Sequence, residues 1–292
     1  MENETITLWP IGASETLPGV GPETAYFAPT GLSAGTSMLR NISDATLTVF
    51  QPAAGKGNGT GVIICPGGGW RILAWTHEGL DMAAWFVERG YTAFLLKYRV
   101  ASTPTDPAAF FAAMAAVNDQ LAAPLPAAKA PRDFTSFVRD PILLRARNLA
   151  AVDGRRALEI VRARAADWGV RPDRIGMIGF SAGAFLVADV AMDPRGPQPA
   201  FVAPIYGGET RGASVPADAP PLFTVVAQDD RLLFKVVEGL YADWSNADRP
   251  AEMHVFARGA HGFGMIRQGL PVDRWTDLLA DWLDDGGFGG TR

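Results

Sequence analysis

The chain has 292 residues, a formal net charge of −5 and 48% hydrophobic residues. That apolar fraction is ample for a buried core and excludes a disordered chain, while the acidic balance argues against a nucleic-acid surface, which normally carries a basic excess. Cys65 is the one cysteine, so an internal disulfide and a multi-cysteine metal site are excluded. No run of about eighteen apolar residues suggests a membrane span.

The start of the chain predicts where the protein resides and how its first segment lies. Residues 1–5 lack the basic and apolar regions of a secretory signal. A cytoplasmic protein is therefore expected, or a periplasmic or secreted one if a signal has been removed. Residues 1–40 are rich in Gly, Pro, Ser and Thr and are expected to lie extended across the surface, anchored by Tyr26 and Phe27.

The first strands lead into a run of glycines. Alternation over residues 46–50 predicts an early strand, and the β-branched run 61–65 predicts a central one. The sequence PGGGW follows at 66–70. Glycines leave backbone N–H groups uncovered, so such a loop can approach a substrate oxygen closely. A flexible turn is the alternative interpretation.

A helix over 78–88, ended by Gly90, and a strand over 91–98 come next. Residues 101–148 then form a longer connection than a plain α/β unit needs. A helix is expected near 107–121, carrying Phe110 and Phe111, with a second apolar group at Phe134 and Phe137. The segment is either a lid over the active site or a surface embellishment.

Residues 149–168 show helical periodicity, with Asp153 inside the apolar stripe. An unpaired carboxylate there would be costly. Arg99 follows the neighbouring strand, so we expect a buried Arg99–Asp153 pair behind the loop 67–69, holding that loop in place.

The next segment predicts a nucleophile elbow, a tight turn that presents a reactive side chain between a strand and a helix. An apolar strand at 174–180 runs into Gly179-Phe180-Ser181-Ala182-Gly183, and an apolar helix begins at about 184. This G-x-S-x-G arrangement forces Ser181 into a strained backbone, while the two glycines let strand and helix pass closely. A glycine-rich turn with an ordinary serine is the alternative.

Strands at 201–206, 222–227 and 253–256, with helices near 233–247 and 272–284, complete the pattern. Alternating strands and helices predict an α/β fold with a mostly parallel central sheet and helices on both faces. Ligands bind such sheets at the carboxyl ends of the strands. The glycine loop and three polar sites, Ser181, Asp229–Asp230 and His261, all follow strand ends.

These positions predict a Ser-His-Asp triad. A serine needs a base, and His261, flanked by glycines, is the best of three histidines, because His254 lies in a strand and His77 precedes a helix. The order Ser…Asp…His is that of α/β-hydrolases. Asp230 is preferred as the acid because Arg231-Leu232-Leu233 follows it, with Asp229 as the alternative. Oxyanion donors are expected from the backbone of Gly68, Gly69 and Ala182.

The chain resembles the α/β-hydrolases of the esterase/lipase group. It is most similar to the bacterial acetylxylan-esterase-like and feruloyl-esterase-like carbohydrate esterases, often labelled xylanase-related. The motifs that carry the resemblance are residues 65–70, 75–79, 97–99, 179–183 and 259–264. Two positions depart from the usual pattern: Ala184 replaces a second glycine, and Pro66 replaces the histidine of the lipase motif.

The resemblance implies one domain over residues 1–292 that hydrolyses short acyl esters, commonly acetyl esters of sugars, without cofactor or metal. Small-molecule or carbohydrate esters are the expected partners, and nucleic acid and membrane are not. Five side chains near the loop, the helix and the insertion are expected to contact substrate: Trp70, Trp75, His77, Phe110 and Phe111.

Three other functions are alternatives on this fold. An aminopeptidase-like or a lactone-opening hydrolase would use the same chemistry, although such enzymes usually need a charged anchor or a propeller domain. A binding protein on a hydrolase fold typically lacks one triad member, whereas candidates for all three are present here.

Overall fold

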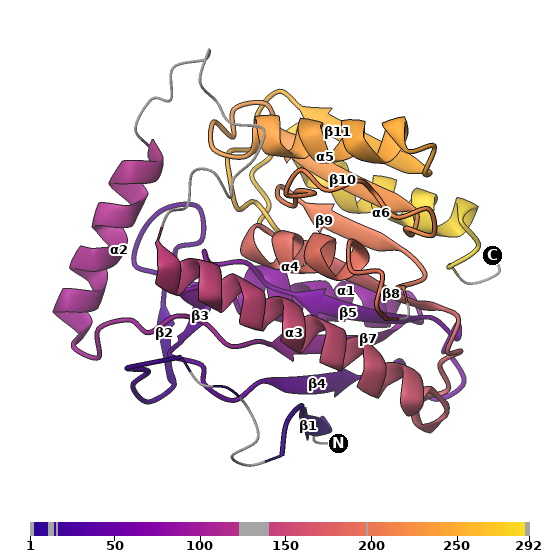
Figure 1. The fold of residues 1–292 in the computed structure, drawn as a ribbon, viewed down its shortest axis with the longest axis horizontal. Helices are drawn as coiled ribbons and strands as arrows, with labels where there is room; N and C mark the ends of the chain where they lie inside the picture. Colours follow the sequence, from indigo (N-terminus) through magenta and orange to yellow (C-terminus); the bar gives the residue numbers. More distant parts are fainter. Residues whose placement is uncertain (1–2, 11–14, 16, 123–139, 197, 290–292) are drawn as a thin grey trace.

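The computed structural model describes residues 3–10, 15, 17–122, 140–196 and 198–289. An eight-stranded sheet lies at its centre, in the order β1-β4-β7-β5-β8-β9-β10-β11 (Figure 1). Its strands are β1 (Thr5–Thr7), β4 (Thr46–Phe50), β5 (Gly61–Cys65), β7 (Thr92–Lys97), β8 (Ile175–Phe180), β9 (Val202–Ile205), β10 (Leu222–Ala227) and β11 (Ala251–Phe256). The pairs β1–β4 and β4–β7 are antiparallel and the others are parallel, which confirms the mostly parallel sheet.

Helices cover both faces of this sheet because alternate strand residues point to opposite sides. On β5, Ile63 and Cys65 join the core cluster of the helices α3 (Pro141–Ala163), α4 (Ala182–Ala191) and α5 (Phe234–Asn246). Val62 and Ile64 join the cluster of α1 (Asp81–Glu88) and α6 (Trp275–Asp285). The predicted α/β architecture is therefore confirmed, and every residue of β5, β8, β9 and β10 is buried.

Helix α3 differs from the prediction at both ends. It begins at Pro141, where the Asp140 side chain accepts a hydrogen bond of 2.9 Å from the Ile142 N–H. This aspartate cap followed by proline at the first helical position is a start signal that the apolar stripe did not reveal. At the other end, a 3-10 turn, η3 (Ala165–Trp168), follows Ala163, and Gly169 ends it with φ of 64°. The first residues of α3 therefore belong to the expected insertion.

The N-terminal segment is more regular than expected. Besides β1, it contains β2 (Thr24–Phe27) and β3 (Ser37–Arg40), which form a second, antiparallel sheet with β6 (Ile72–Leu73). The sequence predicted an extended segment here and did not predict these strands. The hairpin tip also contacts the turn that leads into α1, where the Ser37 N–H donates to the Thr76 hydroxyl over 2.9 Å.

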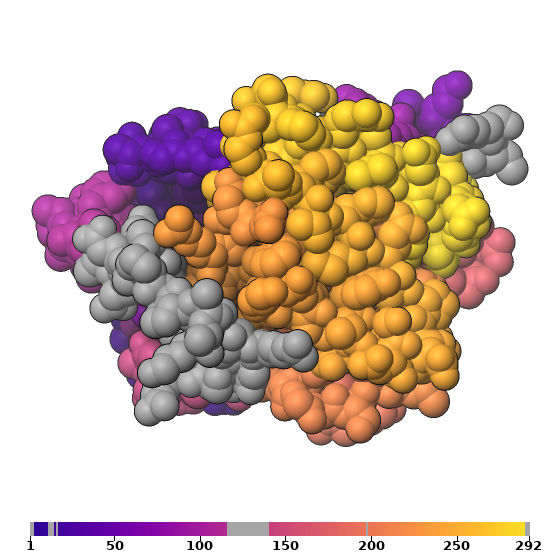
Figure 2. All heavy atoms as spheres, turned by 90° about the horizontal axis from the view of Figure 1, so that it is seen from above, coloured from indigo at the N-terminus to yellow at the C-terminus, as the bar shows by residue number. Residues whose placement is uncertain are grey.

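Helix α2 (Pro107–Ala122) packs on this small sheet and stands apart from the main sheet (Figure 1). In the view of Figure 2, indigo atoms of the N-terminal region and magenta atoms of α2 gather at one end, and the C-terminal third covers most of the face. Residues 123–139, with Phe134 and Phe137, lie outside the described residues. The role of the insertion as a lid stays a prediction.

Among the described residues, no helix combines the length and the apolar character needed to cross a bilayer.

Candidate active site

The predicted elbow is present at the junction of β8 and α4. Ser181 has φ of 48° and ψ of −115°, a conformation that is strained for a residue with a side chain. A side chain at Gly179 would place its Cβ 2.2 Å from the Gly183 carbonyl oxygen, and one at Gly183 would come within 2.0 Å of the Cys65 carbonyl oxygen. Only glycine fits at these two positions, so β5, β8 and α4 meet directly beneath Ser181.

The structure brings Ser181, His261 and Asp230 together at the carboxyl edge of the sheet. The Ser181 hydroxyl lies 2.9 Å from Nε2 of His261, and Nδ1 of His261 lies 2.7 Å from a carboxylate oxygen of Asp230. The other carboxylate oxygen of Asp230 accepts N–H groups of Leu232 and Leu233, both over 3.1 Å. The acid is 2% exposed, so its orientation is fixed by these bonds.

Asp229, the alternative acid, supports the histidine loop instead. Its carboxylate accepts the N–H groups of Gly259 and Ala260, over 3.1 and 2.8 Å. Gln268 donates from its amide to the Gly259 carbonyl over 2.9 Å. The two aspartates therefore have different partners: Asp230 contacts the imidazole of His261, and Asp229 contacts the backbone of the loop that carries it.

The pKa of His261 is raised above its usual value. Burial alone lowers the pKa, but the charge and hydrogen bond of Asp230 and the charge of Glu78 outweigh it. The two carboxylates therefore favour the imidazolium that forms when the histidine accepts a proton.

The glycine loop passes directly beside the serine. A Cβ on Gly67 would lie 2.9 Å from Cβ of Ser181, and a Cβ on Gly68, where φ is 134°, would lie 2.2 Å from the Ile72 carbonyl oxygen. Gly69 has φ of 62°, and a Cβ there would meet no atom within 4 Å, so this residue borders open space. Gly67 and Gly68 must be glycine because a side chain would clash, and Gly68 and Gly69 must be glycine because their φ angles are positive.

Three backbone N–H groups close to Ser181, in the glycine loop and in α4, have no acceptor among the described residues. They belong to Gly68, Gly69 and Ala182. Ala182 is the first residue of α4, so its N–H also lies at the positive end of the helix dipole. The arrangement suits an anionic oxygen close to Ser181.

Two buried side chains that were not predicted as site residues hold the loop. Tyr98 donates its hydroxyl to the Pro66 carbonyl over 2.6 Å, and Glu78 accepts the Gly67 N–H over 2.6 Å. Burial raises the pKa of Tyr98, which keeps the phenol protonated as a donor. Both residues lie in motifs that carry the family resemblance, 97–99 and 75–79, and this was the available signal.

Two of the residues expected to contact substrate are buried, which contradicts that role. Trp70 is 3% exposed and lies beside Phe185, with ring centroids 5.5 Å apart. Phe110 is 1% exposed and packs between Tyr26 and Arg40. Both are core residues, because α4 packs against Trp70 and the small sheet packs against Phe110.

The other three expected contacts have mixed positions. Trp75 is partly buried between the two main core clusters. His77 is 3% exposed, and its Nδ1 lies 3.2 Å from the Thr36 hydroxyl. Phe111 is 38% exposed and meets the edge of Tyr26 at 5.8 Å. Of the five, Phe111 presents the largest accessible ring.

The expected Arg99–Asp153 pair is confirmed, but its position is not. Arg99 donates from Nε and Nη2 to Asp153, the latter over 2.6 Å, and its backbone N–H donates as well. The remaining contacts run to the N-terminal segment: Trp9 donates its indole N–H to Asp153 over 2.7 Å, and Arg99 donates to the Glu15 carbonyl. Among the described residues, the pair's hydrogen bonds therefore reach the N-terminal segment, whereas those to the glycine loop come from Tyr98 and Glu78.

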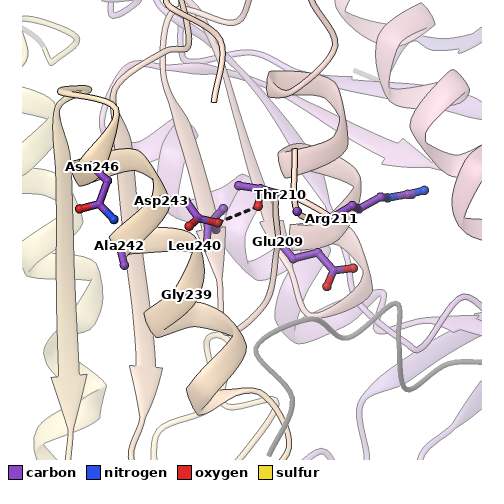
Figure 3. Close-up of a pocket in the computed structure, with 9 residues that line it drawn as sticks. Glu209, Thr210, Arg211, Gly239, Leu240, Ala242, Asp243 and Asn246 are labelled. Atoms are coloured by element: carbon purple, nitrogen blue, oxygen red, sulfur yellow. Dashed lines mark hydrogen bonds between the residues drawn. The ribbon is translucent and has the colours of Figure 1, made fainter. Parts of the chain in front are cut away.

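A second buried charge cluster joins three elements. Arg147 of α3 binds both carboxylate oxygens of Asp189 of α4, at 2.9 Å each, and also pairs with Glu209 of the loop after β9. Burial lowers the pKa of Arg147, but the two carboxylates raise it above its usual value. Beside Glu209, a pocket of about 170 Å³ lies between this loop and α5, and the Thr210 hydroxyl donates to Asp243 across it (Figure 3).

Cys65 is a core residue of β5. Cys65 is fully buried, and burial raises the pKa of its thiol, so it acts as a small apolar residue. Within the described ranges, no three His, Cys, Asp or Glu side chains are grouped so as to hold a metal ion.

Comparisons with known proteins agree with this geometry. The chain is 24% identical to an acetylxylan esterase of Xylanibacter ruminicola, over 83% of this chain and 49% of that protein, so it spans about half the length of the curated relative it matches. An acetyl ester-xyloside bifunctional hydrolase from Caldicellulosiruptor lactoaceticus superposes with a TM-score of 0.64 at 20% identity, covering 99% of this chain and 98% of that one. Esterase 2 of Thermogutta terrifontis, in the form phosphorylated by paraoxon, gives 0.59 at 20% identity, covering 86% and 92%.

MGS-M1, an α/β-hydrolase enzyme from a Medee basin deep-sea metagenome library, superposes with a TM-score of 0.60 at 22% identity, covering 83% of this chain and 92% of that one. The fold is therefore that of an α/β-hydrolase, as expected. The model of the dienelactone hydrolase family matches residues 56–274, a range that begins before β5 and ends after the histidine loop. The chain belongs to the dienelactone hydrolase family.

Proposed function

We propose that the protein is a serine carboxylic ester hydrolase that acts through an acyl-serine intermediate on short acyl esters, with acetyl esters of carbohydrates as the leading substrates. One observation carries the proposal: the Ser181 hydroxyl lies 2.9 Å from His261, whose other nitrogen lies 2.7 Å from the buried Asp230. A serine hydroxyl becomes a strong nucleophile only when a positioned base removes its proton.

In the first half of the reaction, Oγ of Ser181 bonds to the ester carbonyl carbon while Nε2 of His261 takes the hydroxyl proton. Asp230 holds the imidazole in the required tautomer and stabilises its positive charge. The tetrahedral intermediate then loses the alcohol, which receives the proton from His261. In the second half, water attacks the acyl-serine, His261 accepts a water proton and returns it to Oγ, and the carboxylic acid leaves.

The negative oxygen of each tetrahedral intermediate needs donors that are already in place. The N–H of Ala182, at the start of α4, and the N–H groups of Gly68 and Gly69 fill this role in the proposal. Such donors act on charge that exists only in the transition state, and losing one typically costs about 10²–10³-fold in kcat.

The choice of substrate is supported by the relatives. The matched proteins are named as an acetylxylan esterase and an acetyl ester-xyloside hydrolase. We therefore expect kcat/KM to fall from acetyl to octanoyl esters of p-nitrophenol, and acetylated xylo-oligosaccharides to be deacetylated. A preference for long acyl chains would contradict the short-acyl assignment.

The test of mechanism is direct. A fluorophosphonate probe should label the wild-type protein at Ser181, as located by peptide mass spectrometry, and should fail to label Ser181→Ala. A wild-type protein that neither reacts with the probe nor hydrolyses any ester of the panel would contradict the enzyme assignment.

Lactone opening is the second candidate, and the family to which the chain belongs favours it. A lactone is an internal ester, so the same serine, base and oxyanion donors would open it, with the alcohol remaining attached to the acyl group. Parallel assays on acetyl esters and on five- and six-membered lactones separate the two. A kcat/KM higher for lactones by more than tenfold would make lactone opening the better description.

A further inference from the structure

Glu78 is a buried carboxylate beside the glycine loop, and it lies in an unusual backbone turn. It sits in a short π-helical turn, η1 (Thr76–Leu80), between the small sheet and α1. Such turns are rare in proteins as a whole, and those that occur are often found at functional sites. Its side chain is buried, with 3% of the residue exposed. One carboxylate oxygen accepts the Gly67 N–H over 2.6 Å, and the other accepts the Tyr206 hydroxyl over 2.7 Å.

Tyr206 extends this link to the histidine loop. Its hydroxyl accepts the Gly264 N–H over 3.1 Å, and its ring meets the His261 ring edge-on, with centroids 5.2 Å apart. Burial raises the pKa of Tyr206, and the charge and hydrogen bond of Glu78 raise it further, so the phenol remains a donor to Glu78. A continuous path therefore runs from Gly67 through Glu78 and Tyr206 to the loop that carries His261.

The packing leaves Glu78 little freedom to move. A Cβ on Gly67 would lie 2.7 Å from the Glu78 carboxylate, and a Cβ on Gly264 would lie 3.0 Å from Glu78 Cγ. The histidine loop is held from its other side as well, since Trp275 donates its indole N–H to the Gly264 carbonyl over 2.8 Å. The glycines on both loops thus let the backbone close around one carboxylate.

The charge of Glu78 is balanced differently from those of Asp153 and Glu209, which pair with Arg99 and Arg147. Within the described residues, no lysine or arginine nitrogen lies within 4.0 Å of its carboxylate, and the nearest basic nitrogen is His77 Nε2 at 3.8 Å. A buried carboxylate held chiefly by neutral donors is costly for folding. Its negative charge instead acts on His261, whose pKa it helps to raise.

We propose that Glu78 is a positioning residue that fixes the oxyanion loop and the His261 loop in one arrangement around Ser181. The proposal rests on the esterase function above. The Gly67 N–H, bound to Glu78, sets the direction of the following N–H groups of Gly68 and Gly69, which would meet the developing oxyanion. Because those donors act in the transition state, displacing them lowers kcat and leaves KM nearly unchanged.

Glu78→Gln is the first test. Glutamine keeps the size, and its carbonyl oxygen can still accept from Tyr206, but its NH₂ group would face the Gly67 N–H. We expect kcat for p-nitrophenyl acetate to fall about 10–100-fold, as for loops displaced by about 1 Å, with KM changed less than about threefold. The acid limb of the kcat/KM profile should move to lower pH, because His261 loses a negative neighbour.

Tyr206→Phe is the second test and separates the link from the charge. It removes the hydroxyl's hydrogen bonds to Glu78 and Gly264 but leaves the carboxylate in place. We expect a fall in kcat with an acid limb that moves less than in Glu78→Gln. The groups that face His261 are Ser181, Asp230, Glu78 and Tyr206. Neither variant changes Asp230, so its effect on the His261 pKa is the same in both. The double variant should be no worse than about the poorer single variant, because both interrupt one path.

Asp153→Asn is the matched control, since it removes another buried carboxylate that pairs with Arg99 away from His261. It should lower Tm without moving the acid limb. If Glu78→Gln behaves in the same way, with kcat per folded molecule and acid limb unchanged, Glu78 is only structural and the proposal is overturned. The same holds if Tyr206→Phe retains wild-type kcat, which keeps the idea testable should Glu78→Gln not fold.

A readout that needs no catalysis separates this inference from the proposed function. The imidazole of His261 can be titrated by NMR in Ser181→Ala, with and without Glu78→Gln. A lower His261 pKa in the double variant supports the role of Glu78 even if no ester is hydrolysed. An unchanged pKa contradicts it even if the esterase activity is fully established.

Discussion

Around Asp153, a fully buried carboxylate meets an arginine, an indole N–H and a backbone N–H. Around Glu78, a carboxylate almost as buried meets a backbone N–H and a phenol. The first region joins the N-terminal segment to α3, and the second joins two loops at the edge of the sheet. A buried acid paired with a cation, such as Asp153, therefore fixes structure, whereas Glu78, held by neutral donors, also exerts its negative charge on His261.

The largest expected effect lies in the second region. Ser181→Ala should lower kcat on the order of 10⁶-fold, and His261→Ala about as much, because the two groups act as a unit. Both should keep the wild-type Tm within a few degrees, since neither side chain anchors an element. Steady-state kinetics and thermal unfolding on the same samples check this. A variant whose Tm falls together with its activity would show that this region, like that of Asp153, mainly stabilises the fold.

The two neighbouring aspartates sharpen the comparison inside that region. Asp230→Asn should lower kcat about 10⁴-fold, because an asparagine no longer stabilises the imidazolium or selects its tautomer. Asp229→Asn should cost far less, since its oxygen can still accept the N–H groups of Gly259 and Ala260. Measured kcat values for the pair decide the matter. The reverse ranking would show that Asp229 is the acid.

In the first region, Asp153→Ala should destabilise the protein by roughly 3–5 kcal/mol, because the Arg99 charge stays buried without a partner. Activity should fall only as far as the folded fraction falls. Denaturant unfolding, with kcat corrected for active-site labelling, measures both. As a control, Arg99→Met with Asp153→Leu should recover part of the loss, because neither charge then remains. A kcat that drops far more than the folded fraction would show that the pair also supports the glycine loop.

The smallest expected effect concerns α2, which belongs to neither region. Phe111 is 38% exposed, so Phe111→Ala should cost less than about 1 kcal/mol of stability. If the insertion is a lid, KM for a carbohydrate ester should rise while Tm stays. Phe110→Ala is the matched control, because this buried ring should cost about 3–5 kcal/mol. Unchanged kinetics in Phe111→Ala would favour a surface embellishment.

The sequence predicted the central sheet and the arrangement of Ser181, Asp230 and His261 well, for a physical reason. In a parallel sheet, residues that follow strand ends must share one edge, so position along the chain already limits position in space. The choice of Asp230 over Asp229 came from the residues after it, and the structure places Asp230 against the imidazole.

Other features depend on contacts between distant segments, which local pattern does not contain. Strands β2 and β3 are only four residues each, and no residue of β2 is fully buried. They are held by pairing between distant segments, since β3 pairs with β2 on one edge and with β6 on the other. Trp70 and Phe110 were expected to contact the substrate, but an aromatic ring near a glycine loop or a lid can equally belong to the core. Their burial is decided by Phe185 of α4 for Trp70 and by the small sheet for Phe110.

The pairing of β5 has a consequence for how the protein folds. On one side β5 pairs with β7, a near neighbour in sequence, and on the other Gly61 pairs with Ile175 of β8 across the whole insertion. Contacts between such distant residues form slowly, because the entropy of closing the intervening chain is lost before they stabilise it. The glycine loop follows β5 and the nucleophile follows β8. In refolding, the two halves of the site should therefore meet only when this long-range pair forms, so that activity returns after the secondary structure.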